Sequence, residues 1–309
     1  MPVVLICGGS GLIGKRLTQL LTEKNYTVVI LTRQPIINDK RDNINASYAT
    51  WNPEAGTIDT QALAQADYII NLAGAGIADK RWSAARKQII TQSRVKSGQT
   101  IVAALNNNFN KVKCVVSASA IGWYGDDDLL KDEKGFTEDA PAAPGFLGDT
   151  CKAWEQSIDG AAKAGTRIVK YRIGIVLSKE GGALKEFAKP VRFGIAAILG
   201  NGKQIQSWIH IDDVCRMFIY ALENEAVQGV YNAVAPRPVD NRTLIIDLAK
   251  KTKGSFYISA YVPSFIIKML LGEFSTEVLK STTVSSEKIR RTGFQFIYPS
   301  IEAALNTLV

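Results

Sequence analysis

Short apolar runs and amphipathic segments alternate along most of the chain. Apolar runs over 3–7, 27–32, 47–51, 68–71, 114–119, 167–176 and 229–233 predict strands, the most apolar of them buried on both faces. Apolar residues at helical spacing predict helices over 12–24, 82–107, 148–164 and 212–224. Strands that alternate with crossover helices are typical of a parallel sheet covered on both sides. The predicted fold class is therefore α/β with a doubly wound parallel sheet.

The alternation breaks after residue 177. Glycines at 181, 182, 194, 200 and 202 punctuate a stretch that we expect to leave the sheet, and the pattern resumes with the helix over 212–224. Prolines at 236 and 238 mark a second boundary, after which the chain is mostly helical in pattern. We predict that residues 1–177 plus 207–235 form the sheet domain. Residues 178–206 plus 236–309 would form a smaller, mostly helical lobe.

A glycine-rich turn joins the first predicted strand to the first predicted helix. Glycines at three of its positions satisfy G-x-G-x-x-G, the dinucleotide-binding pattern of Rossmann-type sheets. Glycine allows the tight turn and the close approach of a diphosphate, and the helix N-terminus offers free N–H groups and a positive dipole end. We predict that the turn binds a dinucleotide through Gly8, Gly9, Ser10, Gly11, Leu12, Ile13 and Gly14.

The end of the second strand predicts which dinucleotide is bound. NAD-specific sites usually place Asp or Glu there, on the ribose 2′-hydroxyl. Here the strand ends in Thr32-Arg33, with no acid at its tip. A guanidinium pairs with a 2′-phosphate, which a carboxylate would repel. We predict NADP(H) as the cofactor, with Arg33 at its 2′-phosphate. The alternative is that Arg33 is an ordinary solvated residue after a strand.

Composition and charge narrow the remaining function classes. The net charge is +8, but the basic residues are scattered, which suits a small anionic ligand better than nucleic acid. The four cysteines are far apart in sequence and predict buried, reduced thiols rather than a disulfide framework or a zinc site. The apolar N-terminus lacks a basic n-region, and no apolar run is long enough to span a bilayer. We expect a cytoplasmic protein, monomeric or homodimeric.

Several motifs together resemble one known family. They are the glycine turn, NLAG at 71–74, ADKRWSAARKQIITQSR at 78–94, SASAIGWYG at 117–125, CKAWE at 151–155 and WIHIDD at 208–213. These residues are similar to the extended short-chain dehydrogenase/reductases of the nucleotide-sugar epimerase/dehydratase group. The resemblance is closest to an atypical branch labelled "epimerase family protein", which has a small C-terminal domain, here at about 262–309.

This resemblance implies further cofactor contacts. Leu72, Ala73 and Gly74 would line the adenosine side of the cofactor, and Arg94 would contact the dinucleotide from the next helix. Gly174 would lie beside the nicotinamide. From its sequence context alone, Arg94 could equally belong to a solvated helix face.

The catalytic tyrosine of the family is missing. Classical members pair a Ser or Thr after the fifth strand with Tyr-x-x-x-Lys, whose tyrosine is the acid or base in hydride transfer. Ser119 fits the Ser position, but none of the tyrosines here has a lysine four residues later. Tyr124 is a candidate replacement, although a pocket wall is the more ordinary role for it. Cys151 is a weaker candidate, because buried thiols are usually inert.

Two hypotheses for function follow. The first is an NADP(H)-dependent oxidoreductase or epimerase that acts on an unknown small molecule, possibly a nucleotide sugar, with a non-standard proton donor. The second is a catalytically inactive NADP(H)-binding redox sensor or regulatory protein. A pocket between the lobes would be lined by Ser119, Tyr124, Arg172, Gln204, Trp208 and His210.

Two other features favour structural roles. His210, the only histidine, is expected to pack where a strand turns into an Asp-capped helix, and a metal site is not predicted because further soft or imidazole ligands are missing. The acidic residues Asp126, Asp127, Asp128, Asp132 and Glu133 are interpreted as a solvated loop.

Overall fold

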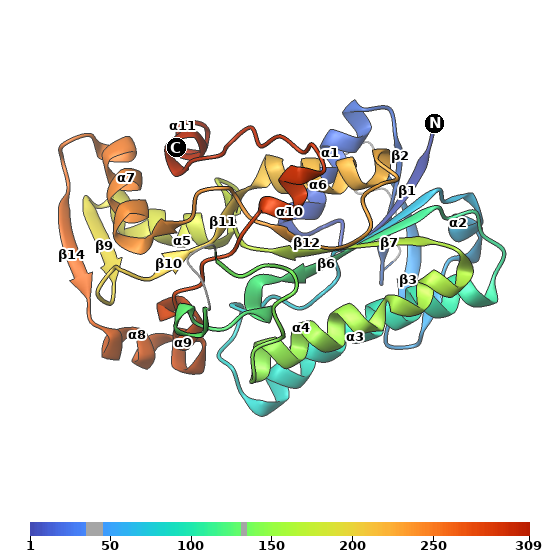
Figure 1. The fold of residues 1–309 in the computed structure, drawn as a ribbon, viewed down its shortest axis with the longest axis horizontal. Helices are drawn as coiled ribbons and strands as arrows, with labels where there is room; N and C mark the ends of the chain where they lie inside the picture. The colour runs from blue at the N-terminus through green and yellow to red at the C-terminus, as the bar shows by residue number, and fades with distance from the viewer. Residues whose placement is uncertain (35–45, 131–134) are drawn as a thin grey trace.

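The computed structural model describes residues 1–34, 46–130 and 135–309 (Figure 1). The strands of its main sheet are β1 (Val3–Cys7), β2 (Thr27–Thr32), β3 (Ser47–Asn52), β4 (Thr57–Ile58), β5 (Tyr68–Asn71), β6 (Cys114–Ala120), β7 (Arg167–Ile173) and β12 (Gly229–Ala233). Their order is β12-β7-β6-β5-β1-β2-β3-β4. All neighbouring strands pair in parallel except β3 and β4. The predicted doubly wound α/β sheet is confirmed.

The direction of strand addition reverses at β1. The chain first builds outward from β1 to β2 and β3, and then returns to the other side of β1 to add β5, β6, β7 and β12. The loops that leave the carboxyl ends of β1 and β5 therefore diverge. In open α/β sheets this reversal opens a crevice where ligands bind. Both the glycine turn and the NLAG motif lie at this point.

Helices cover both faces of the main sheet. Figure 1 shows α1 (Leu12–Glu23) and α6 (Ile211–Glu223) above it, and α3 (Ala84–Asn107) and α4 (Phe146–Ser157) below it. The pleat of β1 sends successive side chains to opposite faces. Val4 and Ile6 join the core under α1 and α6, whereas Leu5 and Cys7 join the core that contains α2 (Thr60–Gln65) and α3. The sheet is thus buried on both sides, as its continuous apolar strands predict.

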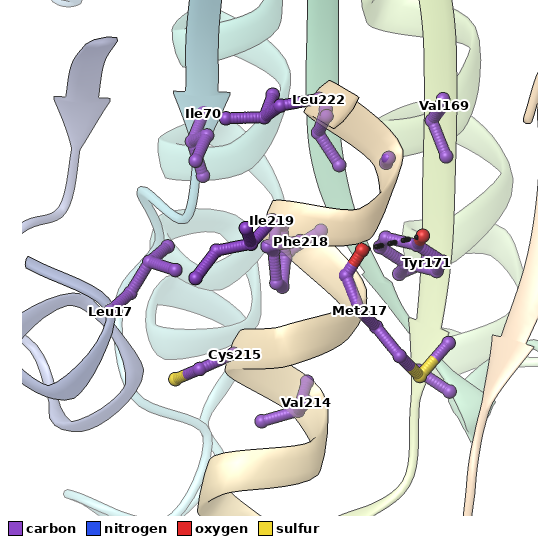
Figure 2. Close-up of a cluster of buried hydrophobic side chains, with 14 of the residues drawn as sticks. Leu17, Ile70, Val169, Tyr171, Val214, Cys215, Met217, Phe218, Ile219 and Leu222 are labelled. Carbon is purple, nitrogen blue, oxygen red and sulfur yellow. Dashed lines mark hydrogen bonds between the residues drawn. The ribbon is translucent and has the colours of Figure 1, made fainter. Parts of the chain in front are cut away.

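Helix α6 is buried along most of its length. Figure 2 shows its apolar side chains between the sheet and α1, close to Leu17 of α1 and Ile70 of β5. The ring of Tyr171 on β7 lies in this core, and its hydroxyl donates to the carbonyl of Met217 at 2.9 Å. That hydrogen bond satisfies the polar end of a fully buried tyrosine.

A second hydrophobic core lies beyond the carboxyl edge of the sheet. It contains side chains from β8 (Ile175–Ser178), α5 (Gly182–Arg192), β9 (Ile195–Leu199), β11 (Trp208–His210), α7 (Asn241–Lys253) and α11 (Ile301–Leu308). The other elements of this part are β10 (Ile205–Gln206), β13 (Val239–Asp240), β14 (Ile258–Val262), α8 (Ser264–Leu271), α9 (Ser275–Leu279) and α10 (Glu287–Arg291). The two-lobe division remains our interpretation. The C-terminal segment, residues 262–309, contributes side chains to both cores.

One predicted helix is divided in the structure, and the cysteines and helix lengths can now be described. The helix expected over 148–164 is α4 followed by a separate 3₁₀ turn at Asp159–Ala164. The four cysteines are buried and unpaired. Every helix of the described ranges is too short or too polar to cross a bilayer.

Candidate functional site

A groove of about 1180 Å³ lies at the carboxyl edge of the sheet, at the point where the strand order reverses. Four short segments and the N-terminal half of α3 form its walls. The lining residues are Gly8, Ser10, Gly11, Leu31, Thr32, Arg33, Gln34, Trp51, Pro53, Glu54, Leu72, Ala73, Gly74, Ala75, Ala85, Gln88, Ile89, Gln92, Ser93 and Lys96. Eight of the predicted cofactor residues are among them. The α3 residues and Trp51 were not predicted from the sequence.

The glycine turn has the shape that a phosphate-binding turn requires. Gly8 has φ +82°, which L-residues with side chains rarely adopt, and a Cβ there would lie 2.9 Å from the Leu72 backbone. A Cβ on Gly14 would lie 2.4 Å from the carbonyl oxygen of Gly8. The turn is therefore packed directly onto α1. Gly11 is the N-cap of α1, with no side chain capping the helix. The first N–H groups of α1 thus have no side-chain acceptor there.

Gly9, Leu12 and Ile13 support the turn from the protein side. A Cβ on Gly9 would meet the Ile30 side chain of β2 at 2.8 Å. Leu12 and Ile13 are partly buried against the core under α1 and α6. Their backbone, rather than their side chains, belongs to the predicted binding turn.

Arg33 is another lining residue of the groove. It is exposed, and it follows β2 directly, where the sequence predicts the 2′-phosphate contact. Glu54 is the one carboxylate among the described residues of the groove lining, and it forms an ion pair with Lys96 of α3. The Arg33 guanidinium therefore shares the groove with one carboxylate that is already neutralised. Residues 35–45, which follow this segment, are outside the described ranges.

Hydrogen bonds to residues of β1 and α3 hold the NLAG loop in place. The Leu72 N–H donates to the Cys7 carbonyl at 2.9 Å, and the Ala75 N–H donates to Ser93 Oγ at 3.0 Å. Arg94 Nη1 donates to the Ala75 carbonyl at 3.0 Å and to the Ile90 carbonyl at 2.9 Å. These bonds fix the wall that Leu72, Ala73 and Gly74 present to the groove.

Arg94 does not line the groove. Its guanidinium lies over the Trp154 ring, 4.9 Å from the centroid, and burial lowers its pKa. Gly174 is not among the described lining residues either, and a Cβ there would come within 2.5 Å of the Ser207 carbonyl oxygen and 2.8 Å of Val234 Cγ1. Contact between either residue and a dinucleotide remains a prediction, and the structure gives both a packing role.

A buried polar network lies at the carboxyl ends of β6 and β7. Ser119 on β6 is paired in register with Arg172 on β7. Ser119 Oγ donates to Glu155 Oε1 at 2.8 Å, and Arg172 Nε donates to the same oxygen at 2.8 Å. Arg172 Nη2 donates to Glu155 Oε2 at 3.1 Å, so the ion pair is bidentate. All three side chains are buried. Sequence analysis named Ser119 and Arg172 but missed Glu155, which belongs to CKAWE.

Tyr124 is the next member of the network. Its hydroxyl accepts from Arg172 Nη1 at 2.9 Å and donates to Asn232 Oδ1 at 2.6 Å. Burial raises the pKa of this phenol, and the nearby Arg172 guanidinium opposes the rise only in part. The ring stacks on Phe136, with centroids 5.2 Å apart. The hydroxyls of Ser119 and Tyr124 are therefore both engaged with protein groups.

The other expected pocket residues are packed in the interior. Trp208 is fully buried and donates from Nε1 to the Arg237 carbonyl at 3.0 Å, and Gln204 donates to the Leu199 carbonyl at 3.1 Å. His210 stacks on Tyr298 with ring centroids 3.7 Å apart.

The N-terminus of α6 is capped by His210, because its Nδ1 accepts from the Asp212 N–H at 3.0 Å. The expectation that an aspartate caps this helix was wrong.

The acidic stretch after Tyr124 is not simply a solvated loop. Asp127 Oδ2 accepts from Ser281 Oγ and Thr283 Oγ1, each at 2.7 Å, and Oδ1 accepts from the Thr283 N–H at 2.6 Å. Asp127 therefore binds Ser281 and Thr283 of the C-terminal part of the chain, a contact that no local pattern predicts. Asp132 and Glu133 lie outside the described residues. Within the described ranges, no three His, Cys, Asp or Glu side chains are grouped around a possible metal position.

Comparison with known proteins gives consistent matches. The model of the NAD dependent epimerase/dehydratase family matches residues 4–233, and that of a domain of unknown function, DUF1731, matches residues 262–308. An "epimerase family protein" of Staphylococcus saprophyticus is 35% identical over 312 residues, covering 100% of both chains. One from Mycobacterium leprae is 33% identical, covering 98% of this chain and 94% of its own.

Solved structures show the same architecture. The human epimerase family protein SDR39U1, determined with NADPH, has a TM-score of 0.86 and 27% identity, with 99% of this chain and 98% of that chain covered. The UDP-N-acetylglucosamine 4-epimerase of Bacillus cereus has a TM-score of 0.76 at 18% identity, with 100% and 95% covered. The second likeness concerns the fold.

Proposed function

Because this chain belongs to the NAD-dependent epimerase/dehydratase family, we propose that it binds NADP(H) in the groove at the carboxyl edge of the sheet. The observation that carries the proposal is the groove itself, which joins the glycine turn, the NLAG loop and Arg33 into one continuous lining. The human relative determined with NADPH supports the choice of dinucleotide.

In this proposal, each groove segment has a defined task. The free N–H groups at the start of α1 bind the diphosphate, and Gly8 and Gly14 allow its close approach. The Leu72–Gly74 wall lies against the adenosine side, and the Arg33 guanidinium pairs with the 2′-phosphate. When bound, the cofactor supplies or accepts a hydride.

The first experiment measures cofactor choice. We expect wild-type protein to bind NADPH at least tenfold more tightly than NADH in titration calorimetry. Arg33→Ala should weaken NADPH binding by roughly 10- to 100-fold, since it removes a charge-assisted contact, and should change NADH affinity by less than about threefold. Arg192→Ala, an exposed arginine at the end of α5, is the matched control. Equal affinities for both cofactors, unchanged in Arg33→Ala, would refute the assignment.

For chemistry, we propose an NADP(H)-dependent oxidoreductase or epimerase that acts on a small molecule of the class of nucleotide sugars. The family match supports this class. Ser119, Glu155, Arg172 and Tyr124 form a continuous chain of hydrogen bonds at the carboxyl ends of β6 and β7. Within it, the Ser119 hydroxyl and the Glu155 carboxylate can exchange a proton directly, which would take over part of the task of the missing Tyr-x-x-x-Lys. The Arg172 guanidinium stays charged and holds Glu155 and Tyr124 in position.

The second candidate is an NADP(H)-binding sensor that does not turn over. It is favoured by the hydrogen bonds of Ser119 and Tyr124, because both hydroxyls are already bonded to protein groups and both side chains are buried. A sensor needs only that the bound cofactor changes the stability or the partners of the chain.

Turnover separates the two candidates. NADPH oxidation is followed against a panel of carbonyl compounds and sugar nucleotides with wild type, Ser119→Ala and Tyr124→Phe. Loss of a detectable rate in either variant, with NADPH affinity retained, supports the enzyme and rules out the sensor. If no substrate is turned over while NADPH binds and raises the melting temperature, the sensor is supported.

A further inference from the structure

A second cavity shares no lining residue with the groove. Its lining residues lie between positions 236 and 299, whereas those of the groove lie between positions 8 and 96. The volume of this second cavity is about 570 Å³, within the usual range for small-molecule pockets. It lies between the loop that follows β12 and the segment that joins α10 to α11. The lining residues are Pro236, Arg237, Arg290, Gly293, Phe294, Gln295, Phe296 and Pro299.

The charged lining residues that the structure describes all have one sign. Arg237 and Arg290 are the ionisable ones among the described lining residues, and none of these is a carboxylate. Both side chains are exposed, and neither guanidinium has an ion-pair or hydrogen-bond partner among the residues that the structure describes. Most other described arginines are engaged, as Arg291 is with Glu287 and Arg216 with Asp213. Two unpaired guanidinium groups at one concave site favour an anion with several acceptor oxygens.

Apart from Gln295, the remaining lining residues are apolar or glycine. Phe294 is buried and packs edge-on against Phe296, with centroids 5.0 Å apart, while Phe296 stays half-buried at the cavity. Two prolines add flat apolar surface.

Hydrogen bonds from α6 fix this segment in place. Asp213 accepts from the Ile297 and Tyr298 N–H groups, each at 2.9 Å, and Arg216 donates to the Gln295 carbonyl at 2.8 Å. On the other wall, the Arg237 carbonyl is held by Trp208. The cavity is therefore formed before any ligand arrives, which lowers the entropy cost of binding.

We propose that this cavity is a second ligand site, which binds a ring-bearing phosphomonoester with its phosphate between Arg237 and Arg290 and its ring against Phe296. The site is independent of the cofactor groove and does not rest on the proposed function. A nucleotide monophosphate and a sugar phosphate share this chemistry, and the ring that is bound distinguishes them.

The test uses phenyl phosphate, glucose 6-phosphate and inorganic phosphate as probes in titration calorimetry, with and without saturating NADPH. We expect one phenyl phosphate per chain, with the same affinity in both conditions, and at least tenfold weaker binding of inorganic phosphate, which lacks the ring. Tight binding of glucose 6-phosphate instead would assign the site to sugar phosphates. Arg237→Ala and Arg290→Ala should each weaken binding roughly five- to tenfold. Arg291→Ala, one residue from Arg290 but outside the lining, is the matched control.

Three results would overturn the proposal. The first is the absence of binding by any phosphomonoester at millimolar concentration, and the second is unchanged affinity in the Arg237→Ala/Arg290→Ala double variant. The third is competition by NADPH, which would place the probe in the cofactor groove. The arginines are exposed, so the variants should fold, and their melting temperatures confirm it.

Discussion

The space around Gly14 sets the tightest limit on any single side chain in the glycine turn. A methyl group there would lie 2.4 Å from the Gly8 carbonyl oxygen and 2.6 Å from Gly9 Cα, and both of these atoms belong to the backbone, which cannot rotate away. We expect Gly14→Ala to lower the free energy of unfolding by about 1–3 kcal/mol, as overpacking does, and to abolish NADPH binding. Urea denaturation and calorimetry check both effects.

Gly181→Ala is the control for this change. Gly181 has extended backbone, and its nearest neighbour for an added Cβ is the Leu12 side chain at 3.4 Å, an ordinary contact. We expect a loss below about 1 kcal/mol for this variant. A Gly14→Ala protein that binds NADPH as wild type does would show that the turn can relax.

The Glu155–Arg172 ion pair makes a second prediction at the residue scale. Both partners are buried, so Glu155→Leu leaves a guanidinium without its bidentate carboxylate. We expect a loss of about 3–5 kcal/mol in unfolding free energy, typical when one partner of a buried pair is removed. Glu186→Leu removes an exposed carboxylate paired with Lys189 and should cost less than about 0.5 kcal/mol. Similar losses in the two variants would contradict the structural role of Glu155.

The positions of candidate site residues could be predicted where one local motif sets them. Gly8, Ser10, Gly11 and Arg33 line the groove, and they could be singled out because strand, turn and helix are consecutive in the sequence; their roles stay predictions. Glu155, Asn232 and Asp127 were missed as partners because their contacts join residues that are 17 to 156 positions apart. No local pattern marks such a pair, and only the fold brings its members together.

At the element scale, helix α6 depends on the protonation state of its cap. His210 accepts the Asp212 N–H through Nδ1, which requires the neutral ring, and Nε2 lies 3.2 Å from Thr307 Oγ1 on α11. Burial lowers the pKa of His210 below its ordinary 6.5, while Asp212 and Asp213 oppose this change and Arg16 adds to it. The cap is therefore lost when the ring takes up a proton.

This geometry fixes the sign of a pH dependence. The unfolded chain binds the His210 proton more tightly than the folded chain, so stability is full above about pH 6.5 and falls as the pH drops below it. His210→Asn keeps an N-cap acceptor but does not titrate. We expect the decrease in urea midpoint between pH 7.5 and 5.5 to be smaller in this variant. Parallel pH profiles for the two proteins would contradict the assignment.

Elements of the main sheet could be predicted more fully than those of the second core. Strands that are buried on both faces can be recognised as continuous apolar runs in the sequence. Accordingly, β1, β2 and β5 begin and end where the sequence predicts. By contrast, β9 and β14 pair across about 60 residues, and α5 contains Pro190. Neither the distant pairing nor a proline-bearing helix has a strong local signal.

At the scale of the whole molecule, the C-terminal segment contributes to both cores. Ile289 and Phe294 belong to the core under α1 and α6, whereas Leu305 and Leu308 belong to the second core. We expect a chain that ends at residue 261 to lose cooperative unfolding and to expose apolar surface, as measured by thermal melting and dye binding. Removal of Val309 alone, which is 52% exposed, should leave the melting temperature unchanged. A sharp transition in the 261-residue chain would show that residues 262–309 are not needed for cooperative folding.

The placement of these last side chains also has a consequence for synthesis. The chain emerges from the ribosome with its N-terminus first, so the strands of the main sheet emerge before Ile289 and Leu308 do. Until then, the unfilled positions beside α6 and α7 stay open to water. During the final part of translation, the nascent protein therefore exposes apolar core surface that these side chains later cover, and chaperones can bind this surface.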